Sequence, residues 1–381
     1  MLPVFEKIFK ICIQNRLQFI DNAFITGDPH NAGFQKGSRT ADNIFFLNGL
    51  VEKQLILGKN LIVIYVDFSQ AFDRVNRNIL FYKIHKLGLK GRLIDTLRNL
   101  YDKTSFRVKS QNKLSDRVKE SIGVNQGGNA SPLLFKKYLQ DLVEYLDEYT
   151  GVHISSDIYV HRAWADDLFL VSTVSNHAQK QLNGLEKFCS PIQMVVNNIK
   201  TKVMLFGKHI ELSLKLNDEP LEIVQKYKCL GNIVNSISTT TGNIFKENAE
   251  YLVQKSRKAI FNILNKTRNI GDMLPKYMFY LYQSMVQPIL TYGSEIWGVD
   301  KKSCKIIDTF FNWFIRLVLK VKPSTCNIIT WGECGIIPPS ILCHISVVLY
   351  AIRLKNMKSD TVLQNVFKEN SHLYEIGFST W

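Results

Sequence analysis

The stretch of sequence that decides the fold reads Arg162-Ala163-Trp164-Ala165-Asp166-Asp167-Leu168-Phe169-Leu170-Val171. Two adjacent carboxylates, Asp166 and Asp167, interrupt a run that is otherwise apolar and typical of a strand. An ionised carboxylate is costly to bury without a partner, and neighbouring side chains on a strand point to opposite faces. The pair can serve one site only where the strand turns, so we predict a hairpin with both residues at its tip. Such a tip could hold a divalent metal ion, which prefers oxygen ligands, although Asp-Asp pairs are also common on protein surfaces.

A further carboxylate follows a second core strand. Leu61-Ile62-Val63-Ile64-Tyr65-Val66 is a continuous apolar run, which predicts a strand buried on both faces, and Asp67 comes directly after it. The three aspartates thus mark the ends of two central strands. A two-metal site for phosphoryl transfer needs this arrangement, because its carboxylates hold two cations about 3.5–4 Å apart. We therefore expect the three carboxylates to converge on one metal site.

Three segments, in this order, resemble the motifs of reverse transcriptases of non-LTR (LINE-type) retrotransposons. They are Val66-Asp67-Phe68-Ser69-Gln70-Ala71-Phe72-Asp73, then Gly123-Val124-Asn125-Gln126-Gly127-Gly128-Asn129-Ala130-Ser131-Pro132-Leu133-Leu134-Phe135, then Ala165-Asp166-Asp167. Several ordered motifs are far more specific than any one of them. The resemblance implies an RNA-directed DNA polymerase that transfers nucleotides onto a primer 3′-hydroxyl. It also implies Mg²⁺ as the cofactor, or Mn²⁺ in its place, held by the three aspartates.

The predicted elements follow the order β-α-β-β-α-β, which suggests a mixed sheet backed by helices, the split-βαβ arrangement of a polymerase palm. The expected fold class is α+β: a right-hand palm with partial fingers over residues 1–235, a helical thumb-like region over 236–330 and a helical C-terminal extension over 331–381. A polar linker at Ser236–Asn243 marks the first boundary. Basic residues on the helix beyond it would grip the backbone of a product duplex, or form a solvated basic face.

The resemblance implies roles for further residues. Phe72 would lie beneath the nucleotide sugar and exclude a 2′-hydroxyl, whereas the alternative is a core aromatic. A cationic side chain near the metal site would neutralise or protonate the leaving pyrophosphate; Lys202 is the candidate, and Lys200 competes for the role. The remaining candidates are Lys36, Arg39, Gln126 and Gly127 for template and nucleotide contacts, with a solvated loop as the alternative for the first two, and Tyr227, Leu230 and Gly231 for positioning the primer.

Composition restricts the partners. Lys and Arg outnumber Asp and Glu by 48 to 33, a net charge of +15 that suits a polyanionic partner. The expected partners are an RNA template, a DNA primer and deoxynucleoside triphosphates; protein partners are not predicted. The seven cysteines form no Cys-x-x-Cys pair, which indicates reduced thiols. No apolar run approaches the ~18 residues of a membrane helix. We therefore expect a soluble intracellular protein, nuclear or cytoplasmic, without membrane contact.

Several alternatives remain open at this point. In the resembled family, part of the fingers subdomain precedes the position that corresponds to residue 1 of this chain. The resemblance therefore implies an N-terminal truncation. A truncated chain is expected to bind primer–template but to extend it poorly. The alternative to an active polymerase is a catalytically impaired or domesticated fragment that only binds nucleic acid. An RNA-dependent RNA polymerase is disfavoured by the bulk of Phe72 and the absence of Gly-Asp-Asp. A group II intron maturase relative is a further alternative, but its usual C-terminal domain is not evident.

Overall fold

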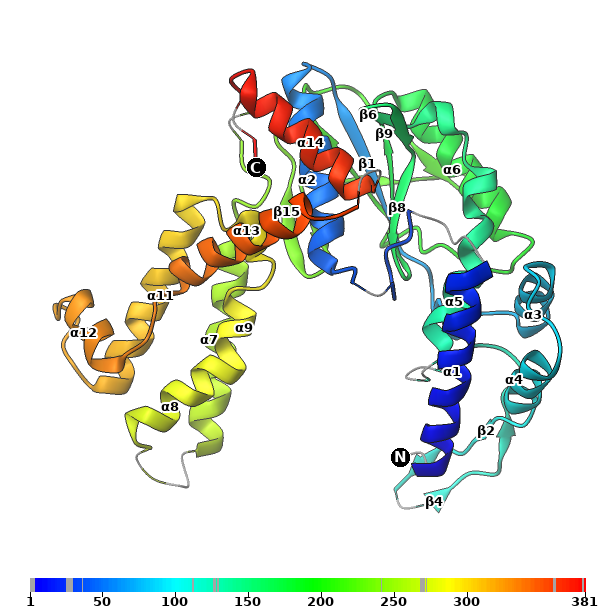
Figure 1. The fold of residues 1–381 in the computed structure, drawn as a ribbon, viewed down its shortest axis with the longest axis horizontal. Coiled ribbons are helices and arrows are strands. Elements are labelled where there is room, and N and C mark those ends of the chain that lie inside the picture. The colour runs from blue at the N-terminus through cyan, green and yellow to red at the C-terminus, as the bar shows by residue number, and fades with distance from the viewer. Residues whose placement is uncertain are drawn as a thin grey trace. The chain divides into compact units, whose positions relative to one another are not determined.

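The computed structural model describes residues 4–24, 30–35, 37–111, 113–125, 128, 130–240, 242–267, 271, 273–358, 361–378 and 380–381 (Figure 1). The chain folds as two compact units. One comprises residues 1–39, 61–203 and 210–223, and the other residues 40–60, 204–209 and 224–381. The second unit is discontinuous in sequence, because helix α2 (Thr40–Ile56) folds with helices from the C-terminal part of the chain.

A five-stranded sheet organises the first unit. Its strands lie in the order β13-β10-β1-β9-β8. Strand β9 pairs antiparallel with both β1 and β8, and β10 pairs parallel with β13. This chain order and these directions give the predicted split-βαβ arrangement, so the α+β palm is confirmed. The strands are β1 (Leu61–Val66), β8 (His161–Trp164), β9 (Asp167–Ser172), β10 (Lys202–Phe206) and β13 (Glu222–Ile223).

The central strands are buried as their sequences predict. Every residue of β1 is buried, as is β9 from Leu168 to Ser172. Helix α6 (Ser175–Cys189) packs against both strands, and Figure 1 shows it alongside β9. Gln181 on this helix donates a hydrogen bond to the carbonyl of Val171 at 2.8 Å, which ties the helix to the sheet. Burial on both faces explains why neither strand alternates between apolar and polar residues.

Other elements of the first unit surround the sheet. Helix α5 begins at Ser131 with Pro132 in its first turn, and the Ser131 hydroxyl lies 3.3 Å from that of Tyr101. The helices are α1 (Val4–Phe24), α3 (Arg77–Lys86), α4 (Arg92–Asp102) and α5 (Ser131–Leu139), with short 3₁₀ helices at Gln140–Tyr145 and Glu148–Thr150. Small hairpins pair β2 (Ser105–Phe106) with β5 (Val118–Lys119), β3 (Lys109–Ser110) with β4 (Lys113–Leu114), β6 (Val152–Ile154) with β7 (Asp157–Tyr159), and β11 (Lys215–Leu216) with β12 (Glu219–Pro220).

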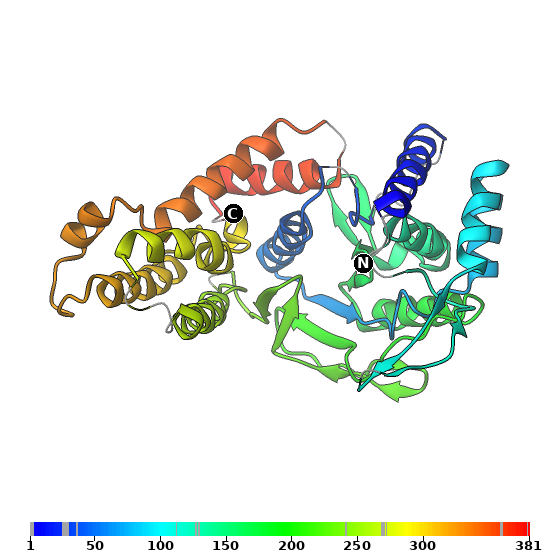
Figure 2. The same cartoon turned by 90° about the horizontal axis from the view of Figure 1, so that it is seen from below.

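The second unit is mainly helical. Helix α2 packs against α10 and α14, and the orange α13 and red α14 lie side by side in both Figure 1 and Figure 2. Its elements after α2 are the hairpin β14 (Lys226–Cys229) and β15 (Asn232–Asn235), then α7 (Asn248–Thr267), α8 (Pro275–Leu281), a π-helical turn (Tyr282–Val286), α9 (Gln287–Leu290), α10 (Ser294–Trp297), α11 (Lys301–Leu319), α12 (Asn327–Cys334), α13 (Pro339–Lys355) and α14 (Val362–Glu375).

A buried ion pair joins α2 to α13. Asp42, only 1% exposed, accepts hydrogen bonds from Arg353 at 2.6 and 3.0 Å and from the Tyr350 hydroxyl at 2.9 Å. Phe45 on the same helix packs edge-on against Tyr350 and Trp381. A bidentate pair of this kind fixes geometry more strictly than a single contact. It therefore holds together residues more than 300 positions apart in the chain.

No single helix among the described residues is long and apolar enough to cross a membrane, whereas α12 and α13, bent by 72° at their junction, pass that test only when taken together.

Candidate active site

Two of the predicted carboxylates lie at neighbouring strand ends. Asp67 is the first residue after β1, and Asp166 occupies the two-residue turn between β8 and β9. The β1–β9 pairing ends at Val66 opposite Leu168, which places Asp67 beside this turn. Ala165 has a φ of +61°, as the first central residue of a type II′ hairpin turn requires. The hairpin therefore presents Asp166 at its tip, as predicted.

Asp166 experiences both burial and the negative charge of Asp67. Asp166 is partly buried, and this burial raises the pKa of its carboxyl group above the usual value. The neighbouring negative charge of Asp67 raises that pKa further. A divalent cation between the two would offset their repulsion, and carboxylate oxygens are the donors that Mg²⁺ prefers. The donor set of Asp67 and Asp166 thus fits such an ion.

Asp167 occupies a different position. It is the first residue of β9, pairs with Trp164 across the hairpin and is exposed. In the part of the chain that the structure describes, no three His, Cys, Asp or Glu side chains lie close enough together to hold a metal ion. The expected convergence of all three aspartates is therefore not seen. The physical reason is the tight turn: Asp166 is in it and Asp167 is already in the strand, where successive side chains alternate between faces.

A short turn positions a lysine at the site. The Asn197 amide donates to the Asp67 carbonyl at 2.8 Å, and the Thr201 hydroxyl accepts from the Asp67 amide at 3.2 Å. The Asn197 side chain in turn accepts from the amide of Lys200 at 3.2 Å. With the turn held by these hydrogen bonds, Lys200 Nζ lies 3.7 Å from Asp67 Oδ2. Lys200 is therefore adjacent to the carboxylate pair.

Lys202 lies two residues further along the chain and has another partner. It begins β10, where it is paired with Glu222 on the neighbouring strand β13, and the two side chains form an ion pair. The sequence named Lys202 as the candidate for the leaving group and Lys200 as its competitor. The structure places Lys200, not Lys202, against Asp67.

The segment before helix α2 passes directly over the turn that contains Asp166. The Ala32 amide donates to the Ala163 carbonyl at 3.0 Å, and the Ala163 amide donates to the His30 carbonyl at 2.9 Å. A Cβ atom on Gly33 would lie 2.3 Å from the backbone nitrogen of Ala165. Only glycine allows this approach. The sequence analysis did not predict that this segment covers the turn.

A Gly33→Ala variant should therefore destabilise the first unit by about 1–3 kcal/mol, the usual cost of forcing extra bulk into a packed site. The added methyl group must displace the backbone of Ala165, because no flexible side chain can move aside. Chemical unfolding measures the effect. Gly332→Ala is the matched control, because a Cβ there meets open space and alanine favours its helix. Equal stability of the two variants would contradict the close approach.

Phe72 lies in the loop after β1 with one face covered. Its ring stacks on that of Phe135 with centroids 4.5 Å apart and planes 20° apart, and the residue is only partly buried. Its carbonyl accepts from the Val124 amide at 2.9 Å, which joins the first predicted motif to the second. The ring of Phe72 is therefore partly exposed and not enclosed in the core.

Arg77 holds the same two motifs together. It is 6% exposed and donates to the carbonyls of Gly123 and Tyr101, each at 2.8 Å, and to the Glu120 carboxylate at 2.9 Å. A guanidinium group provides several donors in a fixed plane. One buried side chain thereby anchors the strands before the second motif to the helix after the first.

The predicted primer-positioning residues form a hairpin in the second unit. Tyr227 lies in β14 opposite Val234, and Leu230 and Gly231 form the turn with φ values of +45° and +86°, the geometry of a type I′ turn. Tyr292 supports the turn: its hydroxyl donates to the Leu230 carbonyl at 3.1 Å, and a Cβ on Gly231 would lie 2.8 Å from its ring. The hairpin is therefore rigidly placed within its own unit.

The four remaining candidates stay predictions. Arg39 is exposed at the end of the first segment. Lys36, Gln126 and Gly127 lie outside the described residues.

Comparison with known proteins identifies the relatives of this chain. The sequence profile of the family described as reverse transcriptase (RNA-dependent DNA polymerase) matches residues 2–252. The chain is 25% identical over 314 residues to a probable RNA-directed DNA polymerase from transposon BS of Drosophila melanogaster, covering 80% of this chain and 34% of that protein. It is 22% identical over 317 residues to the RNA-directed DNA polymerase from mobile element jockey of the same organism, covering 80% and 33%. The chain thus spans about a third of the length of these curated relatives.

Among solved structures, apo telomerase from Candida tropicalis aligns with a TM-score of 0.45 and 13% identity, covering 94% of this chain and 60% of that one.

Proposed function

The chain belongs to the reverse transcriptase (RNA-dependent DNA polymerase) family, of the kind found in non-LTR retrotransposons, and from this we propose that it extends a DNA primer along an RNA template. The observation that carries the proposal is the position of Asp67 and Asp166 at adjacent strand ends, where the charge of Asp67 raises the pKa of Asp166. Two neighbouring carboxylates repel each other, and a bound divalent cation would offset that repulsion, which supports a role in binding one.

The residues of the site divide the chemistry between them. Asp67 and Asp166 would hold a divalent ion, with Mg²⁺ or Mn²⁺ as candidates and Asp167 as a third carboxylate nearby in sequence. The ion supplies charge neutralisation for the triphosphate and for the attacking primer oxygen. Lys200 Nζ, beside Asp67, would neutralise or protonate the pyrophosphate as it leaves. In this role we propose Lys200 in place of Lys202, because Glu222 already pairs with Lys202.

Substrate contacts complete the proposal. Phe72 would contact the nucleotide sugar, Gln126 and Gly127 would line the nucleotide pocket, and Lys36 and Arg39 would contact phosphate. The hairpin turn at Leu230 and Gly231, with Tyr227, would position the primer. Helix α7 would contact the duplex backbone through exposed basic side chains. They are Lys255, Arg257 and Lys258, of which the first two lie over the rings of Tyr251 and Trp313 at 4.8 and 4.9 Å.

Primer extension tests this function directly. The chain is incubated with oligo(dT) annealed to poly(A), deoxynucleoside triphosphates and Mg²⁺ or Mn²⁺. Extension that requires the metal and stops on addition of a chelator is the expected result. Salt-dependent binding of primer–template without extension under any metal condition would instead support the alternative, a chain that only binds nucleic acid.

Sugar discrimination tests the role of Phe72. Phe72→Val should raise the ratio of ribonucleotide to deoxynucleotide incorporation by about tenfold or more, because it removes the bulk that would exclude a 2′-hydroxyl. Both incorporation rates are measured with the same variant in single-nucleotide assays. A general loss of activity lowers both rates equally and therefore leaves their ratio unchanged. A modest loss of stability, about 1 kcal/mol, should accompany the lost stacking on Phe135. An unchanged ratio in a variant that still polymerises would identify Phe72 as a core aromatic.

A further inference from the structure

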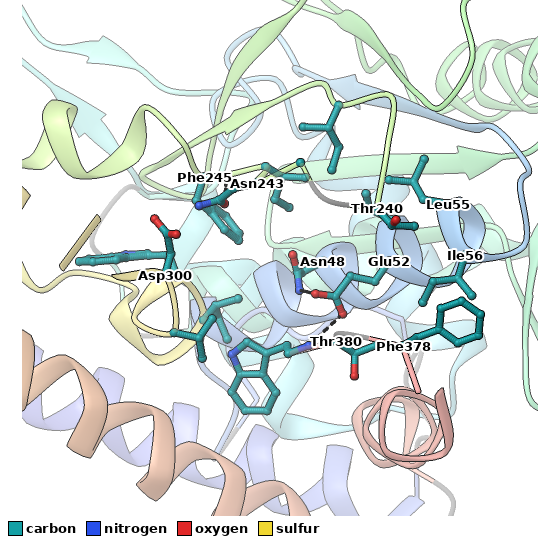
Figure 3. Close-up of a pocket in the computed structure, with 18 of the residues that line it drawn as sticks. Asn48, Glu52, Leu55, Ile56, Thr240, Asn243, Phe245, Asp300, Phe378 and Thr380 are labelled. Carbon is teal, nitrogen blue, oxygen red and sulfur yellow. Dashed lines mark hydrogen bonds between the residues drawn. The ribbon is translucent and has the colours of Figure 1, made fainter. Parts of the chain in front are cut away.

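The second unit contains a cavity of about 460 Å³ that the proposed function does not use (Figure 3). This volume lies within the range of small-molecule sites. Helix α2, the segment before α7, the turn before α11 and the residues after α14 line it. Figure 3 shows the Glu52 carboxylate in the centre, with Asp300 on one side and Phe378 on the other.

The lining of the cavity combines acidic and aromatic groups. Glu52 and Asp300 are its charged residues, and no lysine, arginine or histidine is among the described residues that line it. This is unexpected in a chain with a net charge of +15. Four aromatic residues contribute to the walls: Phe245, Trp297, Phe378 and Trp381.

Glu52 is held in place by neutral donors. Its carboxylate accepts hydrogen bonds from the Asn48 side chain at 2.8 Å, the Asn370 side chain at 3.2 Å and the Trp381 amide at 3.3 Å. Throughout the described residues, no Lys or Arg forms an ion pair with it. Burial raises the pKa of Glu52 to about 7. A carboxylate that is oriented but not neutralised in this way would be stabilised by a cation.

Asp300 is a second carboxylate of the cavity lining that, like Glu52, accepts hydrogen bonds from neutral donors. It caps helix α11 by accepting from the Ser303 amide at 2.8 Å and the Ser303 hydroxyl at 2.7 Å, both neutral donors. Aromatic walls favour a cation with an apolar body, because the ring faces attract positive charge.

We propose that this cavity binds an organic cation: a protonated amine on an apolar or aromatic body, with its charge at Glu52 and its body against the aromatic walls. The free amine and the side chain of a lysine share this chemistry. Isothermal titration calorimetry at pH 8 tests the proposal with phenethylamine, and N-acetyl-lysine amide distinguishes a protein side chain from a free small molecule. The neutral isostere 2-phenylethanol is the ligand control.

The expected result is that phenethylamine binds at least about tenfold more tightly than 2-phenylethanol. The site should favour the amine more at pH 8 than at pH 6, because Glu52 ionises as pH rises through about 7 while the amine stays protonated. Affinity scales with the ionised fraction, so about a tenfold gain is expected over this interval. Asp300 is the other titratable group that faces the cavity from the described lining.

Two cavity variants and one control variant test whether the amine binds in this cavity. Glu52→Gln should weaken phenethylamine about tenfold at pH 8 and remove the pH dependence. Glu375→Gln, the same change at an exposed position on α14, should do neither. Asp300→Asn keeps a capping side chain and should weaken binding a few-fold, which keeps the test usable if the Glu52 variant fails to fold. Equal affinities for the amine and the alcohol, no detectable binding at millimolar concentration, or unchanged binding in both cavity variants would overturn the proposal.

Discussion

An Asp166→Asn variant is expected to lose primer extension by about a thousandfold or more while remaining folded. Asparagine keeps the shape of the side chain but removes one of the two negative charges at the neighbouring strand ends. Without that charge the site should bind a divalent ion weakly and lose the electrostatic stabilisation that dominates phosphoryl transfer. Extension assays across a Mg²⁺ and Mn²⁺ titration measure the loss, and Mn²⁺ binding by calorimetry provides a readout that does not depend on catalysis.

The same variant makes a prediction about stability. Because burial and Asp67 raise the pKa of Asp166, the folded state holds its proton more tightly than the unfolded chain does. The free energy of unfolding must then fall as the pH rises through the range in which the Asp166 carboxyl group loses its proton. At pH 8 without metal, Asp166→Asn should therefore unfold at the same temperature as the parent chain or a higher one. Asp116→Asn, a matched change at an exposed position, should alter neither property. Retained extension, or a large drop in melting temperature, would contradict the assignment.

Lys200→Ala is expected to slow single-nucleotide incorporation by about 100-fold, the lower end of the usual range of about 10²–10⁴-fold for losing a general acid. The equivalent change at Lys202 should slow it only a few-fold. The difference arises from the turn that Asn197 and Thr201 fix against the backbone of Asp67, which directs Lys200 to the carboxylate while Lys202 pairs with Glu222.

Incorporation rates under single-turnover conditions compare the two variants directly. Lys200→Arg should recover part of the rate if the role is charge neutralisation, and little if the role is proton donation, because arginine stays protonated. A larger loss for Lys202→Ala than for Lys200→Ala would return the role to Lys202.

The central part of the fold was predictable because its physical signals are local. The apolar run from Leu61 to Val66 predicted a strand covered on both faces. The carboxylate pair within a second apolar run predicted a hairpin tip. Position within the turn was harder to predict. A shift of one residue decides whether a side chain lies in the turn or in the strand, and this separates Asp166 from Asp167.

Other features depend on contacts between distant residues and leave no local signal. Nothing around Gly33 in the sequence indicates that it crosses Ala165, more than 130 residues away. The choice between Lys200 and Lys202 needs the backbone bonds of Asp67. Glu52 reads as an ordinary polar position on a helix, and its burial becomes evident only when Asn370 and Trp381 are placed beside it.

The packing of α2 against α13 and α14 has a consequence for how the protein reaches its native state. Asp42 must find Arg353, and Glu52 must find Asn370, across more than 300 intervening residues. Contacts this distant in sequence slow folding, because the entropy of closing the loop is lost before the contact forms. During synthesis at about 5–20 residues per second, the apolar face of α2 would wait on the order of 15–60 s for its partners. Throughout that interval this face is exposed to aggregation, so the newly made chain should depend on chaperones more strongly than its native stability would suggest.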